Sequence, residues 1–101
     1  MRAVDLAVLA DALAGEADAL GARIERTRAR LRLAGIEREA AADLPAATVE
    51  RLRELGCLRG ADERALRCAV ETWEGQLEAL EELQAWLEER LACTAEPRVV
   101  S

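Results

Sequence analysis

Two long stretches of this sequence place apolar residues at alternating steps of four and three, and this spacing limits the possible folds more than any other property. The first stretch runs from about Ala3 to Ala34, and the second runs from about Asp62 to Ala92. Steps of four and three keep the apolar residues on one narrow side of an α-helix, the heptad pattern of helices that pack side by side. The sequence therefore predicts two long helices, each with one apolar stripe.

Both stripes continue through about eight turns without a slip in the spacing. Leucine and alanine alternate in the first half of the first stripe, which lets another helix approach closely. The first stripe consists of Leu6, Ala10, Leu13, Ala17, Leu20, Ile24, Thr27, Leu31 and Ala34. The second stripe consists of Leu66, Val70, Trp73, Leu77, Leu80, Gln84, Leu87 and Leu91.

A shorter segment joins the two stretches. Gly35 is a natural end for the first helix, and Gly56 for the middle one. Pro45 suits the first turn of a helix, or it kinks a single longer helix over about 37–55. We expect one helical domain over residues 1–96, with helices at about 3–34, 37–55 and 61–92, and a flexible tail over 97–101.

The composition supports an all-α fold and excludes several kinds of chemistry. The 101 residues include 22 Ala and 16 Leu, but two Trp and no Phe or Tyr, so helix formers dominate over residues that favour strands. The absence of His removes imidazole catalysis and His-ligated metal sites. The cysteines Cys57, Cys68 and Cys93 form no Cys-x-x-Cys pair and are expected to be free thiols. We predict no enzyme activity, cofactor or metal.

The net charge and the hydropathy pattern constrain the partners and the location. A formal charge of −6 argues against broad nucleic-acid binding, which depends on neutralising phosphates. No apolar run approaches the roughly 20 residues that a membrane span needs. Asp5 and Asp11 interrupt the N-terminal stretch, so it lacks the apolar core of a signal peptide. The expected location is the cytoplasm, with no membrane contact.

The charges are segregated along the chain. Residues 23–38 hold six Arg and two acids, whereas residues 71–89 hold seven Glu and no base. In heptads lettered a to g, with the stripes at a and d, Arg23 and Arg30 fall at g, Arg28 falls at e, and the glutamates Glu74, Glu81 and Glu88 all fall at e. Pairs between g and e form when two helices run parallel. This pattern predicts an up-down-up bundle or coiled coil with parallel first and last helices, although parallel pairing between two chains satisfies the same charges.

The last helix carries a second apolar line, formed by Ala79, Leu83 and Trp86, about 100° around from its stripe. This line either packs within the same chain or contacts a partner, and the short middle helix favours a partner or a homodimer. We therefore expect a non-catalytic interaction protein (an adaptor, an assembly subunit or a small chaperone) that self-associates or docks on another helical protein. The alternative is a regulatory partner whose acidic face sequesters a DNA-binding protein or polymerase subunit. The expected contact residues are Ala79, Leu83, Trp86, Arg23, Arg30, Glu74, Glu81 and Glu88.

Overall fold

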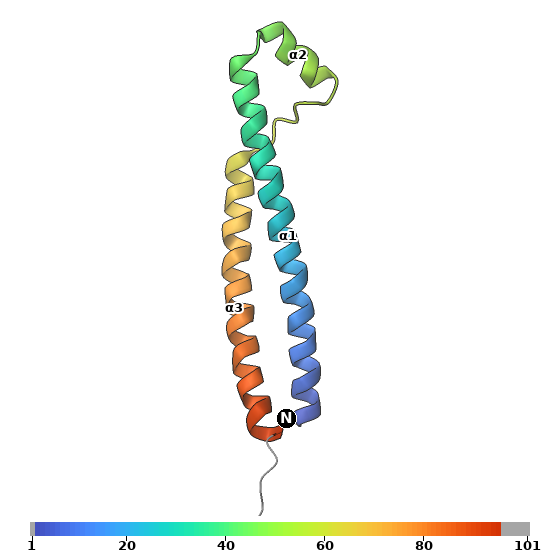
Figure 1. Ribbon diagram of the computed structural model, residues 1–101, viewed down its shortest axis with the longest axis vertical. Coiled ribbons are helices and arrows are strands. Elements are labelled where there is room, and N and C mark those ends of the chain that lie inside the picture. Colours follow the sequence, from blue (N-terminus) through green and yellow to red (C-terminus); the bar gives the residue numbers. More distant parts are fainter. Residues whose placement is uncertain (1, 96–101) are drawn as a thin grey trace, which may run out of the picture. The chain divides into compact units, whose positions relative to one another are not determined.

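A computed structural model describes residues 2–95 and contains three helices within them (Figure 1). Helix α1 spans Ala3–Asp43, α2 spans Ala46–Glu54 and α3 spans Glu63–Ala95. No strand occurs among the described residues, which confirms the all-α prediction. The tail predicted over 97–101 lies outside the described residues.

The chain contacts divide the molecule into two compact units, each containing part of α1 and part of α3. Unit 1 consists of Met1–Arg23 and Trp73–Ser101, and unit 2 consists of Ile24–Thr72, including α2. The prediction that the chain forms one domain stays a prediction.

Helices α1 and α3 run antiparallel within each unit. In unit 1, the start of α1 lies beside the end of α3 (Figure 1), and the Arg23 guanidinium lies 5.5 Å from the centroid of the Trp73 ring. In unit 2, the Nε of Arg38, near the end of α1, donates a hydrogen bond of 2.6 Å to Glu63 at the start of α3. The parallel arrangement predicted within one chain is therefore wrong and the up-down-up bundle is not confirmed, while parallel pairing between two chains stays a prediction.

The length of the middle helix explains this direction. Helix α2 has nine residues, about 14 Å of helix, whereas α1 has 41 residues and α3 has 33, about 60 and 50 Å. A parallel third helix requires the middle segment to return along the full length of the first. Because α2 is far too short for that, α3 turns back along α1 directly.

The predicted stripes form the seam between the two helices. Every described stripe residue on α1 and α3 is buried or half-buried, and Leu87 is only 2 % exposed. Steps of four and three read the same in both directions along a helix, so the stripes fit an antiparallel partner as well as a parallel one. In unit 1, the register that brings Arg23 to Trp73 places small Ala17 at the level of Leu80 and Ala10 at the level of Leu87.

Helix α1 continues well past Gly35, so the predicted end of the first helix is wrong. A glycine inside a helix costs only about 1 kcal/mol relative to alanine, and buried Ala34 together with half-buried Ala41 continues the inward-facing side. The helix ends at Asp43, because a residue before proline disfavours the helical conformation. Residues 37–43 therefore belong to α1, and no helix is kinked at Pro45.

The connections around α2 follow the local sequence. Gly56 has a φ of 74°, and its N–H donates to the Arg53 carbonyl while the Cys57 N–H donates to the Leu52 carbonyl. These two bonds form a Schellman motif, in which glycine is the favoured residue, so the predicted stop at Gly56 is confirmed. At the start of α3, an Asp62 carboxylate oxygen accepts a hydrogen bond from the N–H of Ala65, as an N-cap does.

Candidate interaction surface

One side of unit 1 carries exposed apolar residues. Ala79, Leu83 and Trp86 of α3 lie at i, i+4 and i+7, so they share one face, which we call the apolar ridge. Leu83 is 51 % exposed and Trp86 is 54 % exposed. The Arg90 guanidinium lies 5.8 Å from the centroid of the Trp86 ring. The predicted second apolar line is therefore not covered by the rest of unit 1.

Helix α1 adds a further apolar residue on the same side of unit 1. Glu16 and Arg23 share heptad position g with Leu9, and both line a shallow hollow together with Gln76 of α3. Gln76 occupies the same heptad position as Leu83. Leu9, which is exposed, therefore flanks the seam on the side that carries the apolar ridge. The ridge is the centre of a wider apolar side of unit 1.

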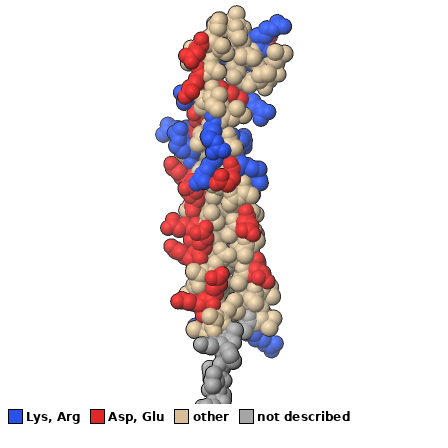
Figure 2. All heavy atoms as spheres, in the orientation of Figure 1, with Lys and Arg blue, Asp and Glu red and all other residues tan. Residues whose placement is uncertain are grey.

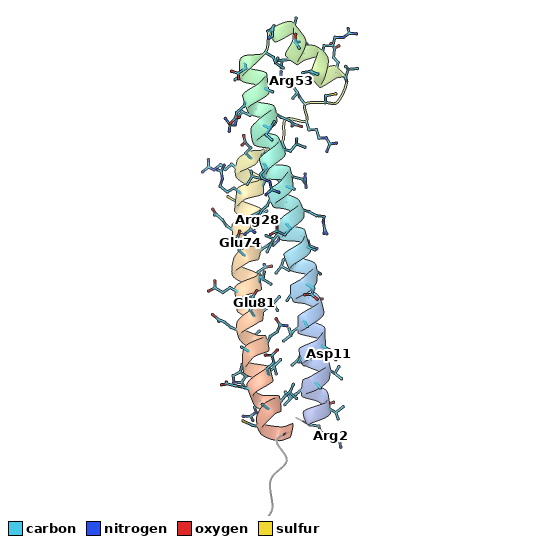
Figure 3. The ribbon with its side chains drawn as sticks, in the orientation of Figure 1. Arg2, Asp11, Arg28, Arg53, Glu74 and Glu81 are labelled. Carbon is cyan, nitrogen blue, oxygen red and sulfur yellow. The ribbon has the colours of Figure 1, made fainter. Side chains whose placement is uncertain are left out.

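The opposite side of α3 in unit 1 is acidic. Glu74, Glu81 and Glu88 recur every seven residues at position e, away from the ridge, and all three are exposed. Glu74 and Glu81 are labelled in Figure 3. Acidic side chains gather along α3 in this unit (Figure 2). The described residues of unit 1 carry ten carboxylates and three arginines, a net charge of −7. Unit 1 therefore presents an apolar side and an acidic side.

Unit 2 is rich in arginine, and only part of that charge is neutralised by ion pairs. Arg28 forms an ion pair of 2.7 Å with Glu25. Arg38 pairs with Glu63, and the hydrogen bond together with the charge of Glu63 raises the pKa of Arg38 above its ordinary value. Three further arginines of α1 are exposed and have no ion pair among residues 2–95: Arg26, Arg30 and Arg32.

No ion pair joins Arg23 or Arg30 to the glutamates at position e within residues 2–95, and their pairing between two chains stays a prediction. Arg23 stacks on Trp73 instead, and Arg30 lines a hollow with Glu37 and Arg59. The physical reason is the direction of α3. When one of two packed helices is reversed, position g faces g and position e faces e, so arginines at g lie on the other side of the seam from glutamates at e.

The sequence interpretation missed a second apolar surface, which lies in unit 2. Leu33 is 47 % exposed and Ile36 is 61 % exposed, and their spacing of three residues puts them on one face of α1. We call these two residues the Leu33/Ile36 patch. The spacing of Leu33 and Ile36 across Gly35 indicates a shared helical face. The two residues were not recognised as a surface because the first helix was expected to end at Gly35.

The described residues offer few groups for metal or thiol chemistry. No cluster of three or more His, Cys, Asp or Glu within residues 2–95 is arranged to hold a metal ion. Cys57, Cys68 and Cys93 are free and exposed. None of the three helices, over the same residues, combines the length and apolar character that crossing a bilayer demands.

Comparison with known proteins finds no matching family model, no similar curated protein and no similar solved structure.

Proposed function

We propose that this chain is a non-catalytic helical protein–protein interaction module that acts in the cytoplasm as an adaptor, an assembly subunit or a small chaperone. It contacts its partner through the apolar ridge of unit 1 and self-associates. The observation that carries the proposal is the exposure of Leu83 and Trp86, each about half accessible in the isolated chain. Such a patch is typical of surfaces that a partner covers.

The accessible surface of the chain supports the same proposal. Only six apolar residues are buried among the described residues, and no large side chain among them falls below 2 % exposure. A pair of helices buries one stripe on each member and leaves the remaining apolar residues to solvent. Association with another helical surface covers that remainder.

The chemistry of the ridge matches that of an interface anchor. Tryptophan and arginine are enriched among the residues that contribute most to binding, because they combine a large apolar area with a polar group. Trp86 and Arg90 supply this combination on adjacent turns of α3. The flanking Ala79 is small enough to admit a side chain from a partner.

Sedimentation equilibrium at micromolar concentration, combined with capture of host proteins, tests this proposal. We expect the wild-type chain to exceed the mass of a monomer or to retain a specific protein, and the double variant Leu83→Ala/Trp86→Ala to lose that behaviour. Leu55→Ala is the matched control, since Leu55 is equally apolar and exposed but lies in unit 2, just after α2. A monomeric wild-type chain that captures the same proteins as the double variant contradicts the proposal.

The acidic side of unit 1 supports a second candidate function. A net charge of −7, with glutamates repeated along α3, suits a regulatory partner that covers the basic surface of a DNA-binding protein or polymerase subunit. Salt separates the two candidates, because screening weakens a charge-based contact and leaves an apolar one nearly unchanged. Affinity that falls steeply between about 0.05 and 0.5 M salt favours the acidic side, and affinity that persists favours the ridge.

A further inference from the structure

We propose that the occupant of the apolar ridge is a second copy of this chain, and that the ridge of unit 1 in one copy packs against the Leu33/Ile36 patch of unit 2 in the other. This inference rests on the proposed function, since it names the partner of the same ridge. Each copy carries both surfaces. In the proposed dimer a two-fold axis relates the copies, so the contact forms twice and the assembly closes.

Most exposed charges around the two surfaces are complementary, whereas Arg90 over the Trp86 ring and exposed Glu39, one turn after Ile36, have the opposite sign to their neighbours. Glu82 and Glu89 lie one turn before and one turn after Trp86, both are exposed, and neither has an ion pair among the described residues. In unit 2, Arg30 and Arg32 lie one turn before Leu33 and Ile36, and Arg26 lies one turn further back. These arginines also have no ion pair within residues 2–95. Packing the ridge on the patch brings unpaired glutamates toward unpaired arginines.

The two symmetric alternatives bring like charges together. A contact between two ridges places Glu82 and Glu89 of one copy close to the same residues of the other. A contact between two Leu33/Ile36 patches does the same with Arg26, Arg30 and Arg32. Like charges across an interface suppress association. The net charges of the units, −7 for unit 1 and +1 for unit 2, favour the mixed contact as well.

Complementary charge reversal tests the proposed contact. One variant carries Glu82→Arg and Glu89→Arg, and the other carries Arg26→Glu and Arg30→Glu. In either variant alone, both contacts of the dimer face like charges, so we expect the dissociation constant measured by sedimentation equilibrium to rise at least about tenfold. In an equimolar mixture, one contact pairs the two reversed surfaces and the other pairs two wild-type surfaces. The mixture is therefore expected to form the dimer.

The matched control is Glu81→Arg/Glu88→Arg, which changes the net charge by the same amount on the other side of α3 and leaves the dimer intact. Circular dichroism of every variant checks that the helices are retained. If the Arg26→Glu/Arg30→Glu variant dimerises like wild type, the contact between ridge and patch is overturned. Dimerisation that fails to return in the mixture also overturns it.

The outcomes distinguish this inference from the proposed function. A wild-type chain that is monomeric at micromolar concentration, but loses a specific host protein on Leu83→Ala/Trp86→Ala substitution, overturns the second copy as occupant and the self-association, and keeps the docking of another protein on the ridge. A chain whose mass and captured proteins are unaffected by that substitution overturns both. A dimer that responds to the ridge and charge variants as described supports both.

Discussion

Unit 1 and unit 2 are built from the same two helices, yet they differ in what surrounds the seam. In unit 1, the described residues belong almost entirely to the paired segments of α1 and α3. In unit 2, α2 and its connections add buried Val49, the Schellman motif at Gly56 and the Arg38–Glu63 ion pair. The comparison teaches that a heptad stripe determines how two helices meet, while the flanking residues determine what each part presents to a partner.

The two units also differ in the chemistry that they expose. Unit 1 exposes an acidic side and a ridge centred on Trp86, whereas unit 2 exposes unpaired arginines beside Leu33 and Ile36. These properties are complementary, and the proposed association between copies follows from that difference. Substitutions placed in each unit measure how far the two units differ in stability within one chain.

The largest effect is expected from shortening a buried seam residue. Leu87→Ala in unit 1 removes the least exposed apolar side chain of the core, so we expect the free energy of unfolding to fall by about 2 to 5 kcal/mol. Ile24→Ala in unit 2 is the matched change. Urea unfolding followed by circular dichroism gives both values, and hydrogen exchange locates the weakened amides. If each substitution increases amide exchange equally in both units, the result contradicts the division of the chain into two separate units.

A smaller effect of opposite sign in the two units is expected from glycine substitutions. Gly56→Ala in unit 2 forces an L-residue to a φ of 74°, which costs about 1 to 2 kcal/mol. Gly15→Ala in unit 1 replaces a helical glycine with open space around its β-carbon position, so we expect a gain of about 1 kcal/mol. Thermal unfolding of both variants checks the signs. Destabilisation by Gly15→Ala shows that this part of α1 is less regular than the structure indicates.

Each unit has one polar residue on a stripe, and replacing it is expected to stabilise the seam modestly. Gln84 is half-buried in unit 1, and Thr27 is buried in unit 2. Gln84→Leu or Thr27→Val adds apolar contact worth up to about 1 kcal/mol. Polar residues at such positions also specify how helices pair. The substituted chains are therefore expected to be more stable but to pair their helices less specifically. Chemical unfolding measures the gain, and a lower midpoint for Gln84→Leu contradicts this account of the seam.

The smallest effect is expected from the ion pair at the end of unit 2. Glu63→Gln removes the charge that faces Arg38, whose side chain is largely exposed. Ion pairs of this kind are screened by water and salt, so the melting temperature should change little and the change should vanish near 1 M NaCl, where the screening length is about 3 Å. A carboxylate oxygen of Glu63 lies 3.5 Å from where a β-carbon on Gly35 would be. A large loss that persists in salt therefore shows that Glu63 stabilises unit 2 by packing beside Gly35.

The sequence was sufficient to predict which residues form the seam, but not the direction of the helices. Spacing by four and three is symmetric under reversal, so Leu6, Val70 and Leu87 are buried in either direction. The charge pattern favoured a parallel pair because opposite charges lie in the C-terminal halves of both helices. The length of the middle helix decided against it, and that length depended on whether α1 ends at Gly35 or at Asp43.

The candidate surface was predictable in part for the same reasons. Leu83 and Trp86 were identified because they lie off the stripe, and their exposure depends on one helix alone. The arginine–glutamate pairs depended on the direction of α3, so within one chain Arg23 lies over the Trp73 ring instead of beside these glutamates. Leu33 and Ile36 were missed, since recognising them requires the helix to extend beyond Gly35.

The repeat of the seam has a consequence for how α1 and α3 are held in place. Because the pattern recurs every seven residues, sliding α3 along α1 by one heptad, about 10 Å, again sets apolar residues against apolar residues. The contacts that such a slip breaks are specific ones: Arg23 on the Trp73 ring in unit 1 and Arg38 on Glu63 in unit 2. These two arginine contacts therefore favour the observed register of α1 and α3 over registers that are shifted by seven residues.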